Sequence, residues 1–62
     1  MSDLETGIAA FNTQDYTQAL RLLKPLADQE NAEAQCIIAS IYHLGLGVES
    51  NPPEAVKWYI KS

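Results

Sequence analysis

The sequence predicts an all-α fold made of two antiparallel helix-turn-helix hairpins. Four helix-start signals occur along its 62 residues, each a Ser, Asp or Asn followed within three residues by a glutamate or glutamine. Behind each signal the apolar residues recur at helical spacing, and no stretch alternates strictly between apolar and polar residues as a half-buried strand does. The joints between the expected helices are short, which favours antiparallel neighbours.

The first hairpin is expected over about residues 3–29. A capping box begins at Ser2, and Asp15 opens the second helix in the same manner. A broad apolar face follows each of these signals, as in helices that cover a core. Pro25 removes one hydrogen bond from the second helix. Because the apolar period continues through it, we expect a kink near residues 22–24 rather than a break.

The second hairpin is expected over residues 32–62. Asn31 opens its first helix, and Asn51, followed by two prolines, opens its last. Gly45 is a helix C-cap signal, because glycine adopts the left-handed conformation without steric cost. The loop over residues 45–50 is longer than the other joints. We treat the whole chain, residues 1–62, as one helical domain.

The two hairpins align with each other, which indicates an internal repeat. A shift of 36 residues places the second helix on the fourth, with Ala19 on Ala55 and Leu23 on Tyr59. A shift of 31 residues places the first helix on the third. Chance similarity among short apolar helices is the alternative explanation of this spacing alone.

Alanines, paired glycines and a Trp-Tyr pair recur in a fixed order in the second hairpin. The segments are Ala32-Glu33-Ala34-Gln35, Ile41-Tyr42-x-x-Gly45-x-Gly47-Val48 and Glu54-Ala55-Val56-x-Trp58-Tyr59-x-Lys61. This pattern resembles the Sel-one-like repeat, a subfamily of the tetratricopeptide-like helical repeats. Residues 7–29 resemble a more divergent unit of the same kind. The resemblance implies a fragment of an α-solenoid, with the second hairpin incomplete because the family pattern continues past Ser62.

The resemblance also implies a function: a protein–protein interaction or scaffolding module. In tetratricopeptide-like proteins the first helix of each pair lines a concave surface that holds peptides. The matching positions here are Glu5, Ala9 and Asn12 on the first helix and Glu33, Cys36, Ser40 and His43 on the third. A protein or peptide is therefore the expected partner. The alternative interpretation of these positions is a solvated helix face.

A second function remains open, that of a small structural or regulatory subunit. Helical arrays usually need about three repeats, so the fourth helix of a two-hairpin array is expected to expose apolar side chains. The residues expected to mediate self-association, or to complete a larger assembly, are Val56, Trp58, Tyr59 and Ile60. As a competing interpretation, Trp58 and Tyr59 have the helical spacing of packing residues.

Charge and hydropathy argue against two classes of partner. The net charge is −4 with only four Lys and Arg residues, too few for nucleic-acid binding, and an acidic surface repels anionic lipid. The longest apolar run has four residues, far short of a membrane span. The N-terminal segment is acidic and lacks the features of a signal peptide. We therefore expect no nucleic-acid or membrane partner and a cytoplasmic location.

Catalysis and cofactor binding are not expected either. Cys36 and His43 lie seven residues apart on one expected helix, about 10.5 Å along its axis. That separation is too large for a thiol–imidazole dyad or for joint coordination of one metal ion. One cysteine and one histidine also fall short of a structural zinc site. The expectation is a non-enzymatic protein without cofactor or metal.

Overall fold

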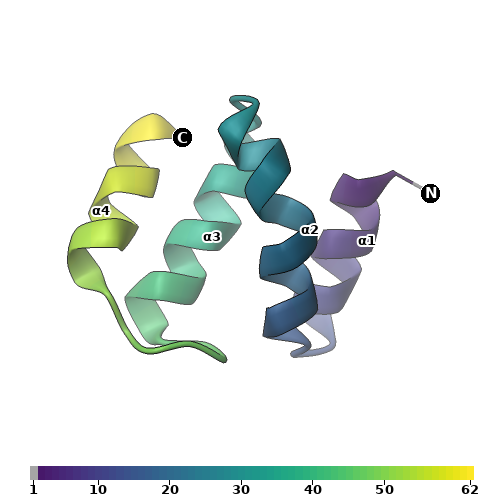
Figure 1. Cartoon of the computed structure of the whole chain (residues 1–62), viewed down its shortest axis with the longest axis horizontal. Helices are drawn as coiled ribbons and strands as arrows, with labels where there is room; N and C mark the ends of the chain where they lie inside the picture. The colour runs from purple at the N-terminus through teal and green to yellow at the C-terminus, as the bar shows by residue number, and fades with distance from the viewer. Residues whose placement is uncertain (1) are drawn as a thin grey trace.

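The computed structural model describes residues 2–62 and contains four α-helices (Figure 1). They are α1 (Asp3–Asn12), α2 (Tyr16–Asp28), α3 (Ala32–Leu44) and α4 (Pro52–Lys61). Residues 2–62 contain no β-strand. The predicted all-α class is therefore confirmed.

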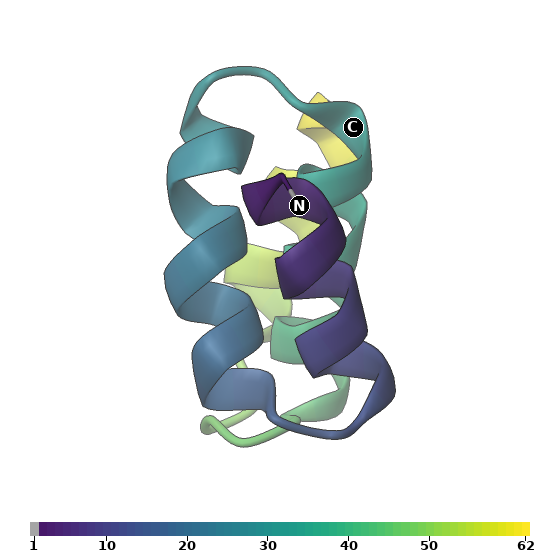
Figure 2. The ribbon, with the colours of Figure 1, turned by 90° about the vertical axis from the view of Figure 1, so that its right-hand side faces the viewer.

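The helices pack in chain order as two hairpins side by side. The main interhelical contacts are α1 with α2, α2 with α3, and α3 with α4. We call α1–α2 hairpin 1 and α3–α4 hairpin 2. Seen from the side of hairpin 1, α1 and α2 stand in front with hairpin 2 behind them (Figure 2). The described chain extends 32 × 23 × 13 Å, as expected for a short array rather than a closed bundle.

All four helices begin at the side chains that the sequence signals predicted. In each case the N-cap side chain accepts a hydrogen bond from the backbone N–H three residues on, at 3.0–3.4 Å. The N-cap residues are Ser2, Asp15, Asn31 and Asn51. These bonds satisfy donors that have no partner inside the helix.

The first three helices end in a common left-handed turn. Gln14, Glu30 and Gly45 each have φ near 67°. The N–H of the residue after each one donates to the carbonyl five residues earlier, at 2.8–3.1 Å. This is the Schellman arrangement that satisfies helix-end carbonyls. The turn at Gly45 was predicted, whereas the turns at the two non-glycine residues were not.

Helix α2 runs without interruption through Pro25 to Asp28, so the expectation that the proline does not break it is confirmed. The proline nitrogen carries no hydrogen, so the carbonyl of Arg21 lacks the donor it would have in a regular helix. This free acceptor lies on the α2 turn that Pro25 occupies.

Small residues bring the helices close together. Ala19, Ala34, Ala39 and Ala55 are completely buried, and Leu23, Ile38 and Ile41 fill the space between them. Gly7 lies against Leu23. A β-carbon built at Gly7 would be only 2.6 Å from Leu23 Cγ, so α1 and α2 approach this closely only with glycine there.

Trp58 belongs to the core and not to the exposed surface that the repeat count suggested. Only 3% of it is exposed. Its indole N–H donates to Glu54 Oε1 at 3.2 Å, and the Nζ atoms of Lys61 and Lys57 lie 5.2 and 5.7 Å from the ring centroid. The expectation of an exposed Trp58 is therefore wrong, and its interpretation as a packing residue is confirmed.

The long loop of hairpin 2 is held in place at both ends. At one end Gly47, with φ of 70°, sits so close to the start of α2 that a β-carbon would be 2.9 Å from Tyr16 Cβ. At the other end the N–H of Asn51 donates to the carbonyl of Tyr42 at 2.9 Å. The loop thus ties hairpin 2 to hairpin 1 as well as joining α3 to α4.

Candidate functional site

The predicted partner-binding residues of α1 lie on its exposed surface. Glu5, Ala9 and Asn12 follow one another at spacings of four and three residues, which places them on one face of the helix. The hydroxyl of Ser2 donates to Glu5 Oε1 at 3.4 Å, a second contact between these two residues at the start of α1. Ala9 and Asn12 are exposed and contribute nothing to the buried core.

The predicted partner-binding residues of α3 make a second row. Glu33, Cys36 and His43 are exposed, and Ser40 is half-buried. The hydroxyl of Ser40 donates to the carbonyl of Cys36 at 3.2 Å, a bond within the helix. We refer to these four residues together with Glu5, Ala9 and Asn12 as the α1/α3 stripe.

Tyr59 of α4 is the residue that the structure brings into this stripe. Its hydroxyl lies 3.4 Å from the hydroxyl of Ser40. Its ring meets the imidazole of His43 edge to face, with 6.3 Å between the ring centroids. The sequence had assigned Tyr59 to self-association and these α3 residues to a groove, but the two surfaces are continuous at this point.

The exposed apolar residues of α4 form a patch that meets the α1/α3 stripe at Tyr59. Val56 is 54% exposed, Ile60 is 77% exposed, and the two are one helical turn apart. With Tyr59, which is 42% exposed, they make up what we call the α4 outer face. Trp58 does not belong to it, because its side chain is buried in the core.

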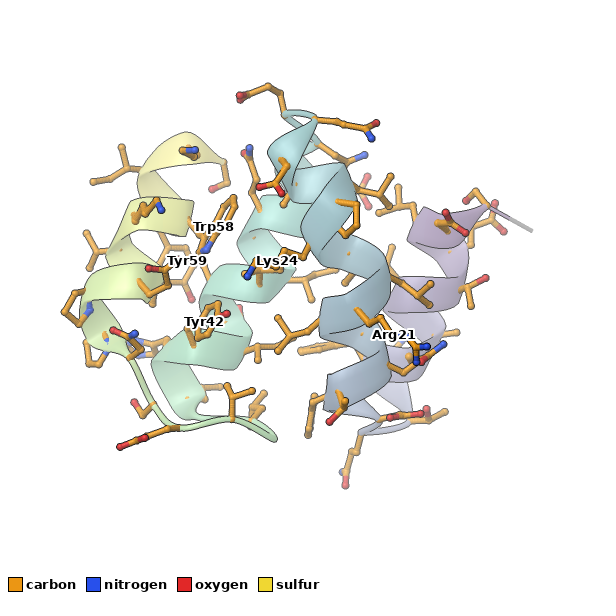
Figure 3. The ribbon with its side chains drawn as sticks, viewed as in Figure 1. Arg21, Lys24, Tyr42, Trp58 and Tyr59 are labelled. Atoms are coloured by element: carbon orange, nitrogen blue, oxygen red, sulfur yellow. The ribbon has the colours of Figure 1, made fainter. Side chains whose placement is uncertain are left out.

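An open groove of about 420 Å³, which the sequence did not predict, lies between α2 and the side of α3 that carries Tyr42. Its lining residues are Leu20, Arg21, Lys24, Pro25, Asp28 and Tyr42. Five of the six form one stripe along α2, and Tyr42 comes from α3. We call this site the α2 groove (Figure 3).

The α2 groove and the α1/α3 stripe face different directions. At 3.6 residues per turn, Tyr42 lies about 140° around the axis of α3 from the middle of the stripe. In the view of Figure 3, Lys24 reaches from α2 over α3 toward the side on which Tyr42 lies, whereas Arg21 extends from the opposite side of α2 toward α1. The molecule therefore offers two distinct polar surfaces and one apolar face.

Two further features, a metal site and a membrane-spanning helix, are not found among residues 2–62. Within residues 2–62, no three His, Cys, Asp or Glu side chains are grouped so as to hold a metal ion. None of the four helices is both long enough and apolar enough to cross a bilayer. The ion pair between Lys57 and Glu54, with 3.8 Å between nitrogen and oxygen, is the one such pair among these residues.

Comparison with known proteins divides the chain at the same place as the structure does. The family model described as the Sel1 repeat matches residues 5–31 and again residues 32–62. Each matched segment contains one helical hairpin. No curated protein and no solved structure matches the chain.

Proposed function

The chain belongs to the Sel1 repeat family, and on this basis we propose that it is a protein–protein interaction or scaffolding module that binds a peptide or protein partner through its helical-repeat surface. Membership confirms the resemblance to the Sel-one-like repeat that the motifs of hairpin 2 predicted. Sel1 repeats generally mediate protein–protein interactions and are typically scaffold-like rather than catalytic.

The observation that supports this proposal is the exposure of the α1/α3 stripe. Six of its seven residues are exposed, and none belongs to the buried core. Their side chains are therefore available to a partner at no cost to the fold.

A pull-down with mass spectrometry tests the proposal. Ala9→Arg with Cys36→Arg adds two long cationic side chains to the stripe without touching the core. The control is Gln29→Arg with Ser62→Arg, which adds the same charge at exposed positions outside the stripe. We expect the stripe variant to lose partners that the wild-type and control chains retain. Equal recovery by all three chains would contradict a role for the stripe.

The apolar α4 outer face favours a second candidate function. Val56 and Ile60 expose most of their side chains on adjacent turns, beside Tyr59. Exposed apolar surface of this kind marks interaction sites. In this alternative the chain is a small structural or regulatory subunit that self-associates, or completes a larger assembly, through α4. Its oligomeric state in solution, measured by sedimentation, is the test.

A further inference from the structure

We propose that the α2 groove binds an acidic segment of a partner protein, with an apolar side chain of that segment seated beside Tyr42 and a carboxylate bound by Lys24. The inference rests on the proposed function, since it presumes a protein partner, and it names a second surface and the chemistry of its ligand. It does not involve the α1/α3 stripe.

The first argument is the shape and lining of the groove. Its volume of about 420 Å³ lies within the range of pockets that bind ligands, and it is open rather than enclosed. Leu20 and Tyr42 are half-buried and give it an apolar floor, and Pro25 adds apolar surface to the wall. An open groove with a narrow apolar floor fits a side chain carried on an extended segment.

The second argument is charge. The chain carries eight acidic and four basic residues, yet the groove is lined by two of the four cations and only one of the eight carboxylates. Among residues 2–62 neither Arg21 nor Lys24 forms an ion pair. Both are exposed, so the long arginine side chain is free to turn toward a ligand held by Lys24. Charge-assisted hydrogen bonds from such groups to carboxylates are stronger than neutral ones.

The third argument is the free carbonyl of Arg21. Helix carbonyls point toward the C-terminal end of the helix, here toward Pro25, which cannot donate to it. Arg21 and Pro25 both line the groove, so this carbonyl belongs to the helical turn that forms its wall. A peptide backbone N–H is its natural partner. Cations, an acceptor and an apolar floor together match a peptide with carboxylates, amides and one apolar side chain.

Peptide chemistry fits the groove better than other anions do. Nucleic acid and anionic membranes present many charges, and the net charge of −4 opposes them over the rest of the surface. A small inorganic anion would make no favourable contact with the apolar floor of the groove. Two cations in an acidic protein instead favour a short segment with a few carboxylates. At physiological salt, repulsion between these carboxylates and the acidic residues elsewhere on the protein is screened beyond about 8 Å.

Peptide selection with matched variants tests the proposal. A phage-displayed library of random dodecapeptides is selected on the immobilised full chain, and enriched peptides are measured by fluorescence anisotropy. The groove variant is Arg21→Gln with Lys24→Gln. The control is Lys57→Gln with Lys61→Gln, so that both variants carry a net charge of −6, two less than the wild-type −4. The single variants Arg21→Gln and Lys24→Gln separate the two cations.

We expect the enriched peptides to be acidic with at least one large apolar residue. Their affinity should fall at least tenfold in the groove variant and less than twofold in the control. Lys24→Gln should account for more of the loss than Arg21→Gln, since Lys24 already reaches toward the groove. In amide NMR spectra the bound peptide should shift residues 20–24, residues 26–28 and Tyr42.

Four results would overturn the groove proposal. Equal losses in the two double variants would mean that only overall charge matters. Enriched peptides without an acidic excess would contradict the proposed ligand, and peptides that shift the α1/α3 stripe instead would place binding elsewhere. Both results would leave the proposed function standing. If no peptide is enriched, the groove has no such ligand. The pull-down with Ala9→Arg and Cys36→Arg then judges the proposed function separately, because that variant leaves the groove intact.

Discussion

The two hairpins follow one pattern but have different surroundings, and equivalent positions differ accordingly. Ala19 and Ala55, related by the 36-residue shift, are both completely buried. Leu23 is also completely buried, whereas Tyr59 at the equivalent position is 42% exposed. Helix α2 packs on both α1 and α3, while the principal contact of α4 is with α3 alone. Burial at the second position therefore depends on the neighbouring hairpin as well as on the repeat pattern.

A third pair of positions differs in the opposite sense. Leu22 is half-buried, but Trp58 at the equivalent position in hairpin 2 is only 3% exposed. The indole of Trp58 donates a hydrogen bond to Glu54, and the side chains of Lys57 and Lys61 lie over its ring. Hairpin 2 thus compensates in part, through one tryptophan, for having a helix on only one side of α4. The large apolar side chains that hairpin 2 still exposes are those of the α4 outer face and Leu44 at the end of α3.

The largest expected loss of stability comes from placing a charge at the position that is buried in both hairpins. Ala55→Glu and Ala19→Glu each place an unpaired carboxylate where nothing is exposed, at a cost of about 4 kcal/mol or more. A cost of this size is comparable to the whole stability of a small domain. We expect both variants to lose cooperative thermal unfolding by circular dichroism.

The control for this pair is Ala32→Glu, an exposed position in the first turn of α3 where a carboxylate is favourable. It should melt as the wild type does. If Ala55→Glu also melts like the wild type, α4 is not docked on α3 as described.

A smaller effect is expected at Gly7, where hairpin 1 has its closest helix approach. Gly7→Ala places a methyl group 2.6 Å from Leu23 Cγ, and overpacking of this kind costs about 1–3 kcal/mol. This should outweigh the gain of about 1 kcal/mol in helix propensity. Chemical denaturation should therefore show a net loss of stability. A net gain of stability in Gly7→Ala would contradict the proposed contact.

Self-association tests the exposed side of hairpin 2. We expect the wild-type chain to form dimers or larger oligomers at tens of micromolar and above. Val56→Gln with Ile60→Gln should weaken association at least tenfold, which corresponds to about 1.4 kcal/mol. Leu44→Gln is the matched control, since Leu44 is 63% exposed but lies at the end of α3. A wild-type chain that sediments as a folded monomer at high concentration would rule out the self-associating subunit.

How far sequence alone predicts this structure depends on whether a feature is local. The four N-caps and the turn at Gly45 were predictable because each is encoded by one residue and its near neighbours. The buried amide of Gln35 was visible only as part of a motif. Its role comes from contact across the hairpins, where it donates to the carbonyl of Ala27 at 3.0 Å. Leu4, a half-buried apolar residue, is its equivalent in hairpin 1.

The sites were less predictable than the fold for the same reason. The α1/α3 stripe followed from helical spacing within each helix. The α2 groove needs Tyr42 of α3 beside a stripe of α2, which no single helix reveals. Its one local signal was the recurrence of Arg21, Lys24 and Asp28 at spacings of three and four residues. Pro25 was identified only as a conflict within the helix, although it also shapes the groove.

The smallest predicted change in stability concerns the left-handed residues that follow α2 and α3, which differ in type. Glu30 and Gly45 have the same φ of 67°, but only glycine adopts it without strain from a β-carbon. Glu30→Gly should therefore stabilise the chain by about 0.5–1 kcal/mol after the greater entropy of unfolded glycine is counted. In a chain of this size that raises Tm by a few degrees, roughly 2–8 °C. Glu30→Gln separates the effect of charge, and Gln29→Gly, at a residue with φ of −91°, should lower Tm because it adds only flexibility. If Glu30→Gly lowers Tm as Gln29→Gly does, the left-handed turn after α2 carries no strain to relieve.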